Sequence, residues 1–173
     1  MLAYRLDELK TYRNKMPAVE FAESYGGACL LGSGMLRTHV GNIRPGETAA
    51  FAADASGLDP QNAIVGRVFL LRGRRRGHLE VTVGRDAQND VVIVDFPVSA
   101  KHCSFIFDLD HWVVIDRGST NGTWVNGVRL SEGEVTYLTD GAHVGIGRYI
   151  FKFFASVLKP VGNPAQGGRK VLF

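Results

Sequence analysis

The 173-residue sequence contains only two cysteines, Cys29 and Cys103, and no Cys-x-x-Cys pair. Two isolated cysteines cannot form the framework of paired bridges found in small secreted domains, and they favour a reducing compartment. No apolar run approaches the roughly 20 residues that a membrane-spanning helix needs. The first ten residues also lack the charged-then-apolar layout of a secretory signal. We therefore expect a cytoplasmic protein, with Cys103 as a small core residue.

A large excess of charge of one sign is also missing. The chain carries 20 Lys and Arg against 17 Asp and Glu, a net charge of +3, which does not by itself point to nucleic acid. The densest run, residues 72–76, has no interleaved aromatic residues for base stacking, and it is interpreted as a solvated hairpin loop. His39, His78, His111 and His143 are not grouped at the spacing of a metal site. We expect no metal, no cofactor, and neither nucleic acid nor membrane as a partner.

The N-terminal third differs from the rest of the chain. Apolar spacing predicts a helix over residues 2–16 and a second helix from Pro17 to Tyr25. A hairpin is expected around Gly32-Ser33-Gly34, and a third helix from Pro45 to Ser56. We assign residues 1–60 to a partly helical N-terminal extension of unknown function.

From Val65 onward, the chain consists of short runs rich in β-branched and aromatic residues, each bounded by Gly, Asp, Asn or Pro. The runs cover residues 68–71, 79–83, 91–94, 103–107, 112–115, 123–125, 128–130, 135–138, 143–146 and 149–154. Asn126-Gly127 between two of them is a strong signal for a two-residue hairpin turn. The pattern predicts a mainly β protein, a sandwich of about 11 short strands over residues 61–157. Residues 158–173 are expected to form a flexible tail.

Three polar clusters interrupt these strands: Gly84-Arg85, Ser99-Ala100-Lys101-His102 and Ser119-Thr120-Asn121-Gly122-Thr123. Each cluster follows the end of an apolar run, so each is expected in a loop. Binding residues tend to collect on loops that a rigid sheet holds in place. We therefore expect the three clusters to converge on one anionic group.

The residue types in the clusters suit a phosphate. Arg85 offers a planar fork of donors that matches a doubly ionised oxyanion. The hydroxyls of Ser99 and Thr120 can donate as well, and a glycine-containing turn such as Asn121-Gly122 adds backbone N–H groups. The side chain of Asn121 carries both a donor and an acceptor, so it can bracket the main chain of an extended peptide. The clusters predict a phosphate pocket that needs neither a metal nor a glycine-rich nucleotide loop.

Residues 65–155 resemble a forkhead-associated (FHA) domain, a β-sandwich that binds phosphothreonine. The resemblance rests on G-R-D-A-Q-N-D-V-V-I from Gly84, V-S-A-K-H-C from Val98, D-R-G-S-T-N-G-T-W-V-N-G from Asp116, and V-G-I-G from Val144, in that order. It implies a bacterial, non-catalytic signalling module that recruits partners phosphorylated by Ser/Thr kinases. The implied partner is a phosphothreonine-containing protein or peptide, with the kinase itself among the candidates.

Carried over position by position, the resemblance divides the clusters by role. The residues implied to bind the phosphopeptide are Arg85, Ser99, Lys101, Ser119, Thr120 and Asn121. The residues implied to support the site are Gly84, His102, Gly122, Asn126 and Gly127. In the family pattern Arg85 and Ser99 hold the phosphate and Asn121 holds the peptide backbone, while His102 braces the loops.

One position departs from the family pattern. The residue after the serine is commonly Arg or Asn, and here it is Ala100, so a direct side-chain contact is missing. The resemblance leaves Lys101 to supply charge instead. We expect this departure to lower the affinity for the phosphopeptide more than to remove phosphate recognition itself.

Two other functions stay open. One is an FHA-fold scaffold whose protein–protein contacts do not depend on phosphorylation. The other is a Ser-dependent hydrolase, because Ser99, His102 and Asp116 contain the three residue types of a catalytic triad. No G-x-S-x-G elbow surrounds Ser99, which argues against the hydrolase.

A regulatory hypothesis concerns Thr48, which has an apolar residue, Phe51, three positions after it. Family members often select on that third position, and the resemblance implies that some bacterial ones are switched by a phosphorylated N-terminal segment. A phosphorylated Thr48 would then fold back into the pocket, at a local concentration far above that of a competing peptide.

Overall fold

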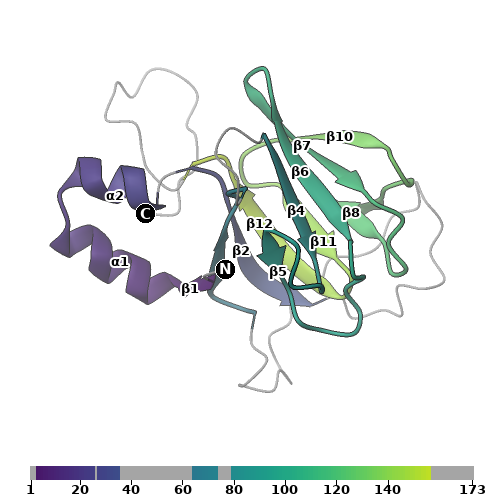
Figure 1. Ribbon diagram of the computed structural model, residues 1–173, viewed down its shortest axis with the longest axis horizontal. Coiled ribbons are helices and arrows are strands. Elements are labelled where there is room, and N and C mark those ends of the chain that lie inside the picture. The colour runs from purple at the N-terminus through teal and green to yellow at the C-terminus, as the bar shows by residue number, and fades with distance from the viewer. Residues whose placement is uncertain (1–2, 26, 36–63, 74–78, 157–173) are drawn as a thin grey trace.

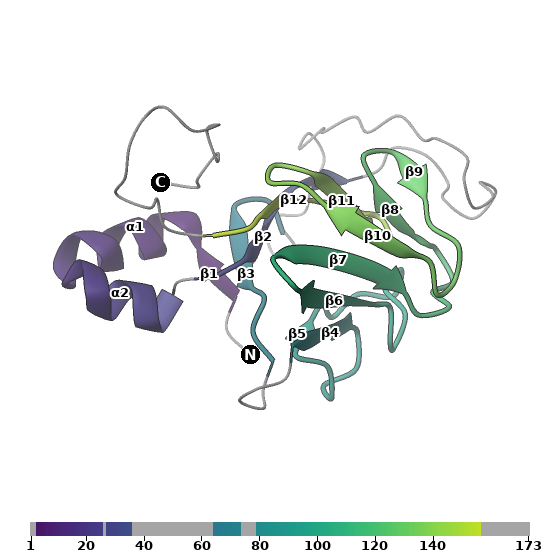
Figure 2. The same cartoon turned by 90° about the horizontal axis from the view of Figure 1, so that it is seen from above.

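A computed structural model describes residues 3–25, 27–35, 64–73 and 79–156 (Figure 1). These residues form two β-sheets that face each other, with two helices beside one end of the larger sheet (Figures 1 and 2). The larger sheet has seven strands, in the order β1 (Ala3–Arg5), β3 (Arg67–Leu70), β2 (Cys29–Met35), β12 (Tyr149–Phe154), β11 (His143–Ile146), β8 (Thr123–Val125) and β9 (Val128–Arg129). The smaller sheet has five, in the order β10 (Val135–Leu138), β7 (His111–Asp116), β6 (Cys103–Asp108), β4 (Glu80–Gly84) and β5 (Val91–Val92).

The core lies between the two sheets and follows from the alternation of the strands. Val81 and Val83 of β4 point inward and are almost completely buried, as are Cys103 and Phe105 of β6. Successive side chains of a strand point to opposite faces, so one alternating run supplies a full inner row. All ten strands predicted from residue 65 onward are present, and the expected mainly β sandwich is confirmed.

The second strand of the chain corrects the hairpin expected around Gly32-Ser33-Gly34. These residues lie inside β2, one continuous strand between β12 and β3 in the larger sheet, and the register against β12 shifts by one residue at Ser33. A Cβ atom on Gly32 would lie 2.0 Å from the carbonyl oxygen of Ile64. The glycine therefore permits close approach of another segment and does not mark a turn. Since β1 also pairs with β3, residues before position 60 contribute two strands to the sandwich.

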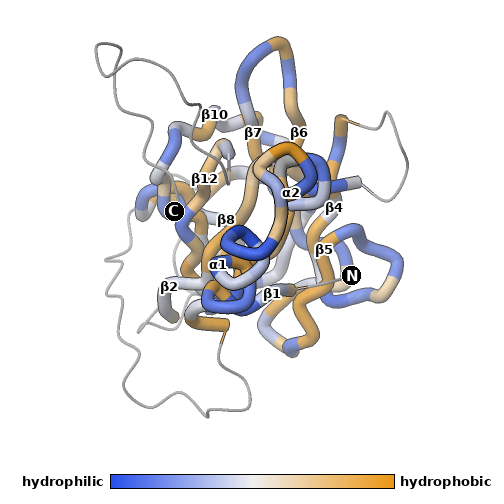
Figure 3. The backbone as a smooth tube through the Cα atoms, turned by 90° about the vertical axis from the view of Figure 1, so that its left-hand side faces the viewer, coloured by the Kyte–Doolittle hydropathy of each residue, from blue (hydrophilic) through white to orange (hydrophobic). Residues whose placement is uncertain are grey.

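The two helices, α1 (Leu6–Lys15) and α2 (Ala18–Tyr25), match the first two predicted helices except at the start. Ala3–Arg5 is a strand, because pairing with the edge of β3 outweighs the helical spacing. Leu9 and Phe21 are fully buried against the outer face of the larger sheet. Apolar and polar stretches alternate along both helices (Figure 3), as expected for helices that cover a sheet on one side.

Some expectations fall outside the residues that the structure describes. These are the third helix over residues 45–56, Thr48, most of the basic run over residues 72–76, and the tail over residues 158–173. Arg72, at the start of the basic run, donates to the main-chain oxygen of Glu23 at 3.1 Å. Within the described part of the chain, neither helix is long and apolar enough to cross a membrane.

Candidate functional site

The three polar clusters meet at the ends of β4, β6 and β8. Hydrogen bonds join the loops directly: Thr120 N–H donates to Ser99 Oγ at 3.0 Å, and Arg85 N–H donates to the Ser99 carbonyl at 2.9 Å. The hydroxyls of Ser99 and Thr120 are 3.4 Å apart. The loops that carry these residues are separated by up to 35 positions in the sequence, and they meet at one place on the surface.

Arg85 is exposed, and its guanidinium carbon lies 6.0 Å from the ring centre of Phe96, within range of a cation–π contact. Gly84, just before it, allows the two loops to touch, because a Cβ atom there would lie 2.3 Å from the Ala100 carbonyl. Phe96 is 86% exposed, and no sequence pattern singled it out. The arginine therefore has a fixed base and a preferred direction, with its donors open to solvent.

His102 is completely buried between the loops. Its Nδ1 accepts the Ser99 N–H at 3.0 Å, and its Nε2 lies 3.1 Å from the Gly122 carbonyl and 3.2 Å from the Gly147 nitrogen. Burial lowers the pKa of the imidazole. The neutral tautomer with the proton on Nε2 satisfies both the Ser99 and the Gly122 contacts. His102 thus ties the serine loop to the loop after β7.

Asp116 organises the loop that carries Thr120, a role that the sequence pattern did not indicate. Its carboxylate is almost fully buried and accepts the N–H groups of Gly118 and Ser119, both at 2.9 Å. It also accepts the hydroxyls of Ser119 and Thr123, each at 2.5 Å. The Ser119 hydroxyl, expected to contact a ligand, donates inside its own loop. The one signal for this role in the sequence is that Asp116 is the first residue of the longest motif, D-R-G-S-T-N-G-T-W-V-N-G.

Asn121 is half-buried and donates from Nδ2 to the Pro97 carbonyl at 2.8 Å. An amide side chain has a second N–H and a carbonyl oxygen, so it retains groups that can meet a peptide main chain. Asn126 and Gly127, with φ of 49° and 90°, form the predicted tight turn between β8 and β9. Asn126 Oδ1 also accepts the His143 N–H at 2.9 Å, which fixes the turn to β11.

Gly122 approaches a second arginine that the sequence did not single out. Arg129, on β9, lies over the ring of Trp124 at 5.9 Å and 3.5 Å from the Thr120 carbonyl. A Cβ atom on Gly122, whose φ is +83°, would lie 2.5 Å from Arg129 Nε. Gly122 therefore combines a left-handed backbone with close side-chain contact, and Arg129 places a second cation beside the Thr120 loop.

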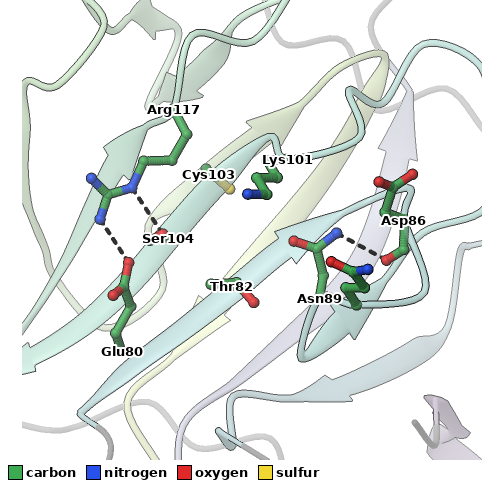
Figure 4. A pocket seen from close by; sticks show the side chains of 9 residues that line it. Glu80, Thr82, Asp86, Asn89, Lys101, Cys103, Ser104 and Arg117 are labelled. Atoms are coloured by element: carbon green, nitrogen blue, oxygen red, sulfur yellow. Dashed lines mark hydrogen bonds and ion pairs between the residues drawn. The ribbon is translucent and has the colours of Figure 1, made fainter.

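Lys101 faces a different part of the molecule. It lines a hollow of about 400 Å³ on the outer face of the smaller sheet, together with residues of β4 and β6 (Figure 4). Asp86, the neighbour of Arg85, lines the same hollow. The charge expected from Lys101 is therefore directed to the hollow beside the junction of Ser99 and Thr120.

The geometry does not form a hydrolase triad. His102 contacts the backbone N–H of Ser99, not its hydroxyl, and Asp116 bonds to its own loop instead of to the imidazole. A triad requires the imidazole to accept from the nucleophile and to be oriented by the carboxylate. In the described part of the chain, no three His, Cys, Asp or Glu side chains come together as a possible metal site.

Comparison with known proteins identifies the family to which the sandwich is similar. The family model for the FHA domain matches residues 81–147. The oxoglutarate dehydrogenase inhibitor of Corynebacterium diphtheriae is 35% identical over 115 residues, which cover 62% of this chain and 78% of that protein. The glycogen accumulation regulator GarA of Mycobacterium tuberculosis is 26% identical over 127 residues, covering 70% of this chain and 75% of the relative.

Other similar proteins are much longer or more distant. The chain spans only 8% of an ABC transporter ATP-binding/permease protein of Mycobacterium tuberculosis, at 38% identity, and 24% of an FHA domain-containing protein of Arabidopsis thaliana, at 32% identity. Among solved structures, one from a study of phosphothreonine-dependent FHA domain interactions is 20% identical, with a TM-score of 0.48. It matches over 73% of this chain and 94% of its own length.

Proposed function

Because this chain belongs to the FHA-domain family, we propose that it is a non-catalytic module that binds phosphothreonine in a partner protein. The observation that carries the proposal is the junction of Arg85, Ser99 and Thr120 at one spot on the surface. The phosphate would lie among these three side chains, and Asn121 would hold the main chain of the partner.

The hydrogen-bond directions support a phosphate at this junction. Ser99 Oγ already accepts the Thr120 N–H. A hydroxyl has one hydrogen to donate and two lone pairs. The Ser99 hydrogen is directed to Thr120 Oγ1 over a long 3.4 Å, so a phosphate oxygen that comes closer can replace this weak contact. The Thr120 hydroxyl and the Arg85 guanidinium add further donors. A phosphate presents acceptors in several directions and suits such a site, whereas a neutral hydroxyl does not.

The charge of Arg85 is not used by the protein itself. Among the described residues, no carboxylate forms an ion pair with it; the nearby Asp95 is paired with Arg148 at 2.7 Å and accepts the Tyr149 hydroxyl. An uncommitted arginine on a loop whose backbone bonds to Ser99 is expected to attract a dianion more strongly than a monoanion. The site therefore favours a phosphorylated side chain over a carboxylate.

The partner and the setting are part of the proposal. A partner phosphorylated by a Ser/Thr kinase fits the site, and the kinase itself is a candidate. Relatives named as an inhibitor of oxoglutarate dehydrogenase and a regulator of glycogen accumulation favour a regulatory role in the cytoplasm. We assign binding to residues 61–157, with residues 1–60 as an extension that completes one sheet and residues 158–173 as a tail.

An oriented library of phosphothreonine peptides, presented to the wild type and to Arg85→Ala, tests the function. The wild type should enrich phosphorylated over unphosphorylated peptides, and the variant should lose this enrichment while keeping its fold. Equal binding of phosphorylated and unphosphorylated peptides would favour the phosphorylation-independent scaffold instead. Persistent enrichment in the variant would show that the phosphate binds elsewhere.

A further inference from the structure

The hollow beside Lys101 is a polar depression on the outer face of the smaller sheet (Figure 4). Its floor contains Thr82 and Ser104, which are directly opposite each other on β4 and β6. Nine residues line it: Glu80, Thr82, Asp86, Gln88, Asn89, Lys101, Cys103, Ser104 and Arg117. None of its polar groups is needed to hold a phosphate at the neighbouring junction.

One end of the hollow is a closed ionic network. Arg117 donates to Glu80 at 2.6 Å and to the Ser104 hydroxyl at 3.0 Å. The pKa of Glu80 is lowered, first by the hydrogen bond with Ser104 and then by Arg117. The carboxylate and the guanidinium therefore neutralise each other, and this end presents a fixed, paired surface.

The other end is rigid as well. Asn89 is almost fully buried and donates from Nδ2 to the carbonyls of Asp86 and Ala100, at 2.9 and 2.7 Å. Thr82 donates from its hydroxyl to Asp90 at 2.9 Å and accepts the Asp90 N–H in return. The loop between β4 and β5 is thereby held in one conformation along the rim.

Lys101 differs from these residues. Its side chain is exposed between the two ends of the hollow (Figure 4), and no ion pair involves it within the described residues. Arg117 is already matched by Glu80, so the ammonium of Lys101 is the cation that an incoming group can use. The exposed carboxylate of Asp86 lines the same hollow, so an acidic group is favoured next to Lys101 and not throughout the hollow. The hollow thus offers one available cation above a floor of hydroxyls.

The hollow and the phosphate junction share a wall. Two backbone bonds join the loops, from Arg85 N–H to the Ser99 carbonyl at 2.9 Å and from Asp86 N–H to the Ala100 carbonyl at 3.2 Å. Arg85 and Ser99 face the junction, while Asp86 and Lys101 line the hollow. Two residues of chain span at most about 7 Å, so an extended ligand can reach from one to the other within a few residues.

We propose that this hollow binds a flanking segment of the same phosphorylated partner, a polar stretch in which an acidic side chain pairs with Lys101. The inference rests on the proposed function, because the phosphothreonine anchors the segment. Contiguity raises the local concentration of the flank at the hollow once the phosphate is bound. The paired end with Arg117 and Glu80 and the floor of Thr82 and Ser104, whose hydroxyls are already hydrogen-bonded within the protein, would contact the flank but would not select its charge.

The test uses a phosphothreonine library with about six randomised residues on each side, enough to reach past the hollow at about 3.4 Å per residue. The wild type should prefer Asp or Glu at one flanking position by about two- to fivefold, the range of a partly exposed ion pair. Lys101→Glu should reverse this preference to Lys or Arg at the same position. Lys10→Glu, an equal change of charge on the exposed side of α1, should leave the preference as in the wild type.

A second measurement locates the flank. Backbone amide resonances of Thr82 and Ser104 should shift with a long acidic phosphopeptide and remain in place with free O-phosphothreonine. The proposal is overturned if the wild type shows no acidic preference, if Lys101→Glu keeps it, or if these resonances do not respond. Those failures leave phosphate binding intact, whereas binding that survives Arg85→Ala would contradict the proposed function itself.

Discussion

His102→Ala should destabilise the protein by about 2–4 kcal/mol. The side chain is fully buried and bonds the Ser99 N–H and the Gly122 carbonyl. Its removal leaves these two groups without a partner, at about 1–3 kcal/mol each. A water molecule that enters the space between them would recover part of the loss. For a chain of this length, the thermal midpoint should fall by roughly 5–15 °C.

Urea unfolding at pH 8, followed by the fluorescence of the buried Trp124, measures the change. The dependence of the free energy of unfolding on urea concentration should stay constant, while the urea concentration at the midpoint falls. His111→Ala is the matched control: His111 is exposed and makes a ring contact with Tyr137 at 6.0 Å, so its loss should cost less than about 0.5 kcal/mol. Equal midpoints for the wild type and His102→Ala would refute the role of the imidazole as the link between the loops.

Three further outcomes follow from the same structure. Burial lowers the pKa of His102, so the unfolded chain takes up a proton that the folded protein does not. The free energy of unfolding should therefore be level above about pH 7 and fall towards pH 5; a His102→Gln variant that falls equally would contradict this. Titration calorimetry should show that Arg85→Ala weakens phosphopeptide binding about a hundredfold, while its thermal midpoint stays unchanged. Phe96→Ala should weaken binding only about two- to fivefold, because the cation–π contact with Arg85 contributes less than the charged hydrogen bonds to the phosphate. Burial raises the pKa of the Cys29 thiol to about 12 and raises that of Cys103 as well, so a thiol reagent should label both only after unfolding, and rapid labelling of the native protein would contradict their burial.

The strands from residue 65 onward could be predicted because each run carries its own signal. Alternation and flanking turn residues are local properties, and the pleat converts them directly into an inner and an outer face. The strand β2 carries no such signal. Gly32 and Gly34 are typical of a turn, and the true reason for Gly32 is the approach of the Ile64 carbonyl, which is distant in sequence. A contact of that kind cannot be inferred from local pattern.

In the candidate site, too, some features have a local signal in the sequence and others depend on the tertiary structure. The order of the clusters sufficed to predict that Arg85, Ser99 and Thr120 come together, because each cluster follows a strand end. The direction of each side chain was not predictable. Ser119 uses its hydroxyl on Asp116, and Lys101 lines the hollow instead of the junction; both depend on the exact path of the loops.

Because neighbouring loop residues face different parts of the surface, two contact regions lie side by side. Neighbouring residues of one loop, such as Arg85 and Asp86, lie on opposite sides of a wall that two backbone hydrogen bonds hold closed. Because the wall is made of main chain, substitutions on one side leave the other side in place. Ala100 contributes its carbonyl to the wall by accepting from Asp86 and Asn89, so the missing side chain at this position costs the wall nothing. If the flank binds at Lys101 as proposed, selectivity for the flank should change on substitution of Lys101 without loss of the phosphate contact at Arg85.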